Sequence, residues 1–147
     1  MADPRRVVCT LAAVAVTLVA VSLPLGGQEQ REDRKPSLSL KATPPLGFSP
    51  LRVRVVVDVK GGGNDYADFY CAATEWDWGD GTISEMSSDC DPYEAGKSSI
   101  RRRYSAEHIY RQQGGYKMVF RLKQKSRIVA AANATVQVRA GSGEFGE

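Results

Sequence analysis

Strict alternation of apolar and polar residues dominates the middle of this sequence. Every second position between residues 51 and 59 is apolar, namely Leu51, Val53, Val55, Val57 and Val59. Successive side chains of a β-strand point to opposite faces, so a period of two predicts a strand with one buried face. The β-branched valines favour the same conformation. A strand of this kind needs a partner sheet against which to bury its apolar face.

The same period recurs along the chain, and turn residues separate the repeats. We expect strands over residues 37–42, 51–60, 69–78, 100–110, 116–122 and 130–138. Three prolines are expected to keep residues 43–50 out of any strand ladder, and glycines predict turns at 79–82 and 114–115. Six or seven short strands without helical periodicity predict an all-β fold, an antiparallel β-sandwich.

The first 30 residues have the layout of an export signal. Arg5 and Arg6 precede the uncharged run 7–23, which predicts a signal peptide or an uncleaved N-terminal anchor over residues 1–30. We expect a secreted, periplasmic or cell-surface protein. It would be membrane-anchored only if residues 7–25 are retained. The rest divides into a linker at 31–36, the domain at 37–139 and a flexible tail at 140–147.

The cysteine count supports the same compartment. Cys9 lies within the expected export segment, so its removal leaves Cys71 and Cys90. An even pair in an oxidising compartment predicts one disulfide, and two free thiols are the alternative. The spacing of the pair excludes a Cys-x-x-Cys redox motif.

One motif is specific enough to suggest a family. The segment Trp76-Asp77-Trp78-Gly79-Asp80-Gly81-Thr82 resembles the Trp-Asp-Phe-Gly-Asp-Gly-Thr signature of polycystic kidney disease (PKD) domains, with Trp78 in place of phenylalanine. His108-Ile109-Tyr110 and Gly115-Tyr116 resemble that family's His-x-Tyr and Gly-x-Tyr segments, in the same order. The resemblance spans residues 37–139 and implies an immunoglobulin-like β-sandwich. The resemblance also implies a role as a spacer or a ligand-contacting module, as in surface proteins and secreted hydrolases.

The motif residues have structural roles in this interpretation. Trp76 and Trp78 lie two apart on one strand, so both can fill the space between two sheets. Asp77 points oppositely and can accept hydrogen bonds from turn amides. Tyr110 and Tyr116 flank the expected glycine turn, where a phenol can bond to nearby backbone. We therefore expect these residues to be scaffold rather than a ligand site.

Acidic and basic residues are segregated along the sequence. Residues 58–94 hold ten acidic side chains and one basic, whereas residues 95–139 hold eleven basic and one acidic. This predicts a basic surface for anionic glycans, lipid headgroups or an acidic partner. Its candidate residues are Arg101, Arg102, Arg103, Lys123, Lys125 and Arg127. The alternative is cross-strand charge pairing without a ligand. A net charge of only +3 argues against nucleic acid.

Metal and catalytic chemistry have weaker support. Calcium could take oxygen ligands from the aspartates 65, 68, 77, 80, 89 and 91, but their spacing does not match an EF-hand loop. Solvated loop carboxylates are the alternative interpretation. His108 is the only histidine and no cysteine nucleophile lies near it in sequence, so we expect it to be half-buried and structural. We expect no enzyme and no cofactor.

These observations lead to an exported, non-catalytic β-sandwich that binds a protein or polysaccharide at the cell envelope or outside the cell. Two alternatives remain open. One is a purely structural envelope protein held by an uncleaved N-terminal segment. The other is a module stabilised by calcium.

Overall fold

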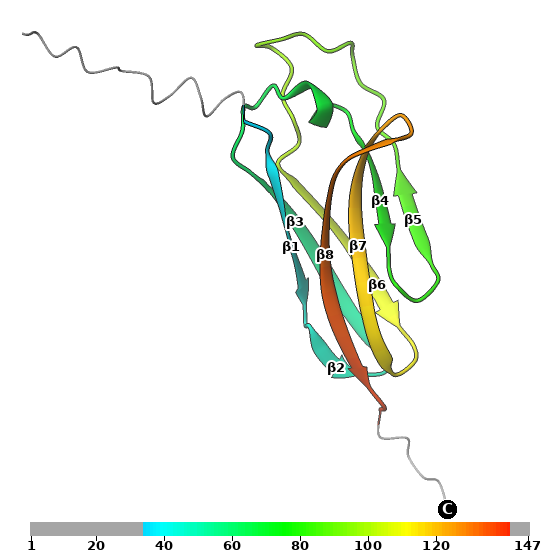
Figure 1. Cartoon of the computed structure of the whole chain (residues 1–147). Coiled ribbons are helices and arrows are strands. Elements are labelled where there is room, and N and C mark those ends of the chain that lie inside the picture. Colours follow the sequence, from blue (N-terminus) through cyan, green and yellow to red (C-terminus); the bar gives the residue numbers. More distant parts are fainter. Residues whose placement is uncertain (1–33, 142–147) are drawn as a thin grey trace, which may run out of the picture.

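Residues 34–141 are described by a computed structural model, in which two β-sheets pack face to face (Figure 1). This part of the chain forms eight strands and one short 3₁₀ helix. They are β1 (Ser37–Thr43), β2 (Leu46–Phe48), β3 (Leu51–Lys60), η1 (Ala67–Phe69), β4 (Ala73–Asp77), β5 (Ile83–Met86), β6 (Arg103–Tyr110), β7 (Gly114–Gln124) and β8 (Arg127–Arg139). No helix among these residues is long and apolar enough to cross a membrane.

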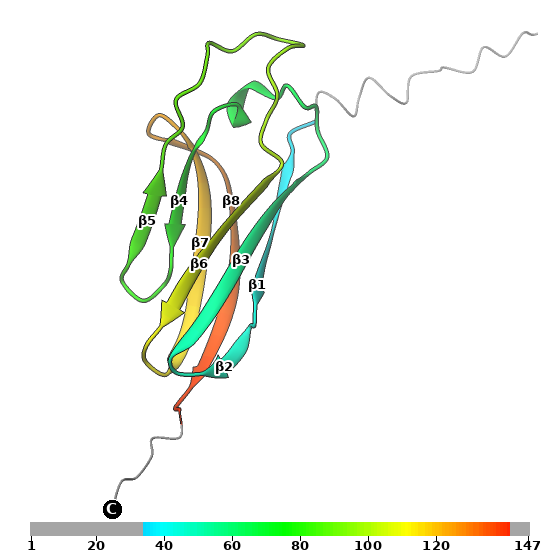
Figure 2. The same cartoon turned by 180° about the vertical axis from the view of Figure 1, so that it is seen from behind.

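The sheets differ in size. The three-stranded sheet has the order β1-β3-β6, and the five-stranded sheet has the order β2-β8-β7-β4-β5 (Figure 2). Every pair is antiparallel except β2–β8, which is parallel. Strand β3 is central in its sheet, and its register places Val57 opposite Tyr104 and Arg54 opposite Glu107. The all-β, antiparallel sandwich predicted from the sequence is therefore confirmed.

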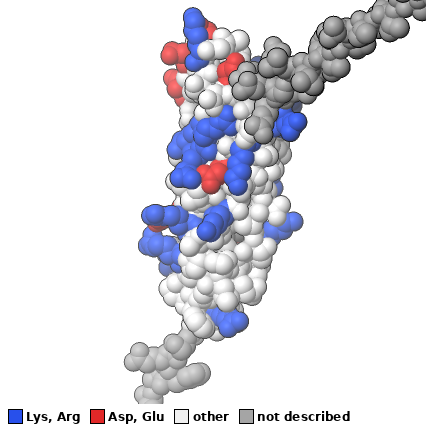
Figure 3. All heavy atoms as spheres, turned by 90° about the vertical axis from the view of Figure 1, so that its left-hand side faces the viewer, with Lys and Arg blue, Asp and Glu red and all other residues white. Residues whose placement is uncertain are grey.

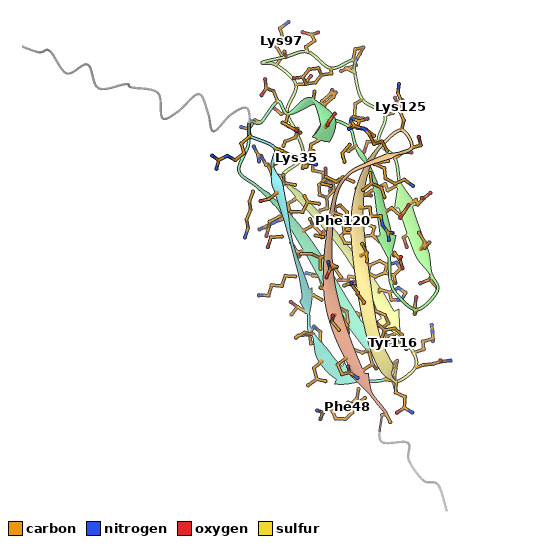
Figure 4. The ribbon with its side chains drawn as sticks, viewed as in Figure 1. Lys35, Phe48, Lys97, Tyr116, Phe120 and Lys125 are labelled. Atoms are coloured by element: carbon orange, nitrogen blue, oxygen red, sulfur yellow. A yellow bond between two sulfur atoms is a disulfide. The ribbon has the colours of Figure 1, made fainter. Side chains whose placement is uncertain are left out.

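The core lies between the two sheets. Val53, Val55 and Val57 of β3 are fully buried, as the alternation predicted. Facing them, β7 contributes Met118, Phe120 and Leu122, and β8 contributes Val136 and Val138. The rings of Tyr104 and Phe120 meet across the sheets with centroids 5.4 Å apart. Phe120, which is fully buried, is labelled in Figure 4.

The strand expected over residues 69–78 begins only at Ala73. Phe69 ends the 3₁₀ helix η1 and is buried, packed edge-on against Tyr66. Cys71 has a φ of 51°, a left-handed backbone that is incompatible with an extended strand. Apolar content alone therefore overestimated this strand.

Two short strands were not expected from the sequence. The prolines do not keep β2 out of the sheet, because the Pro45 carbonyl still accepts a hydrogen bond from the Gln137 amide at 2.9 Å. Strand β5 pairs with β4 although all four of its residues are exposed. Both are edge strands, so only one side of each needs backbone partners.

The turn expected at Gly114–Gly115 is also misplaced. Both glycines lie in β7, where Gly114 pairs with Val138 and Gly115 with Gln137. The reversal occurs over residues 111–113 instead. The expected export segment 1–30 and residues 142–147 of the expected tail lie outside the described residues.

Candidate functional site

The Trp-Asp-Trp motif builds an aromatic column inside the sandwich. Trp76 and Trp78 are 7% and 2% exposed. Their rings are nearly parallel with centroids 5.7 Å apart, and the His108 ring also stacks on Trp78, with centroids 4.5 Å apart. The indole Nε1 of Trp78 donates to the Ser84 hydroxyl at 3.0 Å. This column joins β4 and β5 of one sheet to β6 of the other.

The rest of the motif closes the turn between β4 and β5. Asp77 Oδ1 accepts from the Gly79 amide at 3.2 Å, and Asp80 Oδ1 accepts from the Thr82 amide and hydroxyl at 3.0 and 2.6 Å. Gly79 has a φ of +78°, and a Cβ there would lie 2.5 Å from the Lys117 carbonyl oxygen. Only glycine fits this position. Gly81 also has a positive φ, of 90°.

Two side chains of β6 attach the turn to the opposite sheet, and Tyr116 near the start of β7 packs against one of them. His108 Nε2 lies 2.7 Å from Asp80 Oδ2, and the Tyr110 hydroxyl donates to the Trp78 carbonyl at 2.9 Å. Burial raises the pKa of Tyr110 to about 12, and the nearby Asp80 charge adds to the rise. The Tyr116 ring stacks on Tyr110, and its hydroxyl donates to the Gln112 carbonyl. All these contacts hold the scaffold together.

The structure separates the two predicted basic runs. Arg103 lies on β6 of the three-stranded sheet, whereas Lys123 and Arg127 lie on β7 and β8 of the five-stranded sheet. Lys125 is exposed in the β7–β8 turn, at the tip visible in Figure 4.

Two arginines of the first run have internal partners. The Arg102 guanidinium donates to the Gly61 and Gly62 carbonyls and to Asn64 Oδ1, at 2.6 to 3.1 Å. It therefore fastens the loop after β3. The Arg101 guanidinium lies 5.1 Å from the centre of the Tyr104 ring and donates to the Arg103 carbonyl.

On the five-stranded sheet, the acidic and basic halves of the sequence pair across strands. Glu75 and Glu85 lie opposite each other, and Lys123 Nζ contacts both carboxylates at 2.7 and 3.2 Å. Arg121 contacts Glu75 at 2.6 Å and Asp77 at 3.4 Å. The side chains of Arg121 and Lys123 are each only 25% exposed. This geometry favours the charge-pairing interpretation for this sheet.

The three-stranded sheet has a different surface. Its outward positions on β1, β3 and β6 carry five cations and two carboxylates. The cations, which we call the basic face, are Lys41, Arg52, Arg54, Lys60 and Arg103. The carboxylates are Asp58 and Glu107. Figure 3 shows Lys and Arg side chains gathered over this side of the molecule, with few acidic groups between them.

Four of the five residues of the basic face were missed as site candidates. The outward alternation of Arg52, Arg54 and Lys60 in the middle strand was a usable signal. Lys41 joins them only because β1 pairs with β3, with Lys41 opposite Val56. A search for contiguous basic runs does not find this pattern, because strand alternation spaces the cations two residues apart.

The expected calcium ligands are distributed among other partners. Asp65 Oδ2 accepts from the Gly96 amide at 3.0 Å, and Asp68 pairs with Arg127 at 2.9 Å. Asp77 and Asp80 have the partners given above. Within residues 34–141, no three His, Cys, Asp or Glu side chains are grouped as a metal site would require. Calcium stays an untested alternative.

Cys71 and Cys90 form a disulfide, with Cα atoms 6.1 Å apart. The bond joins the turn before β4 to the long segment after β5, which has no regular strand between residues 87 and 102. Tyr70 and Tyr93 support the same segment, since their hydroxyls donate to the Asp91 and Asp65 carbonyls. The alternative of two free thiols is wrong for this structure.

Two hydrogen-bonded carboxylates, Glu75 and Asp80, predict that the fold loses stability in acid. Hydrogen bonds from Lys123 and Arg121 hold the pKa of Glu75 below its ordinary 4.5. At Asp80, burial acts to raise the pKa, but hydrogen bonds from Thr82 and His108 outweigh it and the pKa lies below 3.8. Unfolding therefore takes up protons in acid, so the free energy of unfolding should fall as the pH drops below about 4.5.

Glu75→Gln isolates one of these groups. Chemical denaturation between pH 2 and 7 should show a shallower fall in unfolding free energy for this variant than for the wild type. The number of protons taken up on unfolding, which sets this slope, should be smaller by up to one. Exposed Glu94→Gln is the control and should keep the wild-type slope. An unchanged slope in Glu75→Gln would remove Glu75 from the explanation.

Comparisons with known proteins find similarity in fold alone. No protein-family model matches this sequence, and no curated protein matches it. The PKD domain of an M14-like peptidase from a Thermoplasmatales archaeon aligns at 12% identity and a TM-score of 0.48, covering 71% of this chain and 96% of that one. The CARDB domain of a Pyrococcus furiosus protein, in complex with di-metal ions, aligns at 12% identity and a TM-score of 0.48, covering 75% and 97%.

The two packed sheets define the class of this protein. It is a small immunoglobulin-like β-sandwich module, as the sequence predicted.

Proposed function

We propose that this chain is an exported, non-catalytic module that binds a protein or carbohydrate partner at the cell envelope or outside the cell. The basic face carries the proposal. Its three arginines, Arg52, Arg54 and Arg103, have side chains that are 66%, 70% and 72% exposed. They stand on an open sheet surface, where an anionic partner can reach them without any rearrangement of the fold.

Two features support export. The order of charged and apolar residues in the segment 1–30 is that of a signal peptide or signal anchor. The Cys71–Cys90 disulfide is a bond that persists in oxidising compartments. Neither feature depends on the basic face, so the support for export is separate from the support for binding.

The surroundings of His108 support a non-catalytic role. It is the only histidine of the sequence. One ring nitrogen contacts Asp80, and the ring stacks on the buried Trp78. These contacts position the β4–β5 turn, so this histidine has a sufficient structural role without a reaction.

Affinity capture from the native envelope fraction tests the proposal. The full chain should recover a reproducible protein or glycan, and the triple variant Arg52→Gln/Arg54→Gln/Arg103→Gln should lose most of it. The matched control is Lys117→Gln/Lys125→Gln/Arg139→Gln, which removes the same charge from exposed positions outside the basic face. This control should retain the partner.

The intact mass of the recovered chain tests the export component. We expect the loss of the N-terminal segment and of two hydrogens for the disulfide. Capture that is equal for both triple variants would contradict the assignment to this face. Clean recovery with no partner, and with residues 1–30 still attached, would instead favour the anchored structural protein.

A further inference from the structure

The basic face contains a shallow recess between two ion-paired rows. In one row Arg54 lies opposite Glu107, and in the other Arg103 lies opposite Asp58. The row between them pairs Val56 with Ser105, and Lys41 completes it on β1. Val56 and Ser105 help to line the recess, which has a volume of about 430 Å³, and Arg54, Arg103 and Glu107 border it.

The two arginines already bind carboxylates at this site. Arg54 donates from Nε and Nη2 to Glu107 Oε1 at 3.0 and 2.7 Å, and Arg103 Nε donates to Asp58 Oδ1 at 2.7 Å. Guanidinium groups recognise carboxylates through such directed donors. Both arginine side chains are at least 70% exposed. Exposed pairs of this kind contribute little net free energy, so a competing carboxylate can replace the internal one at small cost.

We propose that this recess binds a linear polysaccharide that carries carboxylate groups. Two sugar carboxylates then take the places of Glu107 and Asp58 at Arg54 and Arg103. The chain of the polymer crosses the strands over Val56 and Ser105, with Lys41 beside it. This inference rests on the proposed function and gives it a ligand class and a contact site.

The composition of the face favours a hydrated polymer over a membrane. The exposed large apolar side chains of the described residues are Leu46, Phe48, Ile83, Met86, Tyr93 and Ile128. None of them lies on β1, β3 or β6. A surface that inserts into lipid presents apolar residues beside its cations. A stable protein interface usually has aromatic anchors at its centre. Here the centre holds a valine and a serine, which leaves hydrogen bonds and charge for recognition.

Binding of the full chain to alginate, a carboxylated polysaccharide, tests the proposal by titration calorimetry at fixed ionic strength. Arg54→Gln should weaken binding about tenfold. Glu107→Gln should strengthen it about threefold, because Arg54 is released from its internal partner. The matched controls are Lys117→Gln for the lost cation and exposed Glu85→Gln for the lost carboxylate, and both should bind like the wild type.

The opposite signs distinguish this site from a general effect of net charge. If Glu85→Gln strengthens binding as much as Glu107→Gln, net charge alone is responsible and the recess is not the site. Neutral dextran should not bind. Preference for phosphatidylserine vesicles or polyglutamate over alginate would overturn the ligand class. If alginate does not bind but envelope capture still depends on Arg52, Arg54 and Arg103, this inference fails and the proposed function stands.

Discussion

Replacing Trp78 with alanine should lower the free energy of unfolding by about 3–5 kcal/mol, the range for truncating a buried tryptophan. The indole is 2% exposed and stacks with both Trp76 and His108. Its removal leaves a cavity between the sheets and leaves Ser84 without its indole donor. Chemical denaturation with a circular dichroism readout measures the change. A loss below about 1 kcal/mol would show that the aromatic column is not a main part of the core.

Trp78→Phe is the matched variant. Phenylalanine is the residue that PKD domains usually have at this position of the motif, and it keeps an aromatic ring against Trp76 and His108. It cannot replace the Nε1 hydrogen bond to Ser84, so we expect a smaller loss, about 1–2 kcal/mol. If Trp78→Phe and Trp78→Ala destabilise equally, the hydrogen bond rather than the packing dominates at this position.

Periodicity found the long strands because burial on one face repeats every two residues. Val53, Val55 and Val57 follow that rule without exception and occupy the middle of the core. The periodicity did not predict strands β2 and β5, because they lie at sheet edges and are short. Their residues mostly face solvent, so no apolar alternation marks them. Backbone pairing with a neighbour defines them: β2 pairs with the distant strand β8, and β5 pairs with β4 across a short turn.

The candidate surface was likewise predicted only in part from the sequence. Segregation of charge along the sequence predicted a basic surface and left cross-strand pairing as the alternative, and the contacts of Lys123 with Glu75 and Glu85 are such a pairing. The basic face required the register of three strands, which places Arg54 beside Glu107 from 53 residues further along. Alternation states which residues point outward from a strand. It does not state which strands are neighbours, and a surface depends on both.

Removing the Cys71–Cys90 disulfide is expected to cost about 3 kcal/mol, since it closes a loop between cysteines separated by 19 residues. In a domain of this size the loss corresponds to a fall in melting temperature of about 10–20 °C. The double variant Cys71→Ser/Cys90→Ser keeps residues of similar size at both positions. Its melting temperature should match that of the wild type in reducing agent.

The disulfide variant should lose stability without losing the sandwich or the basic face. The bond lies outside every strand and joins the turn before β4 to the irregular segment after β5. The variant should therefore keep the wild-type circular dichroism spectrum at 20 °C and bind alginate with unchanged affinity. Protease cleavage should increase between residues 87 and 102, where the bond restrains the chain. Cleavage within β3 or β6 instead would mean that the bond supports the three-stranded sheet itself, and the recess would then depend on it.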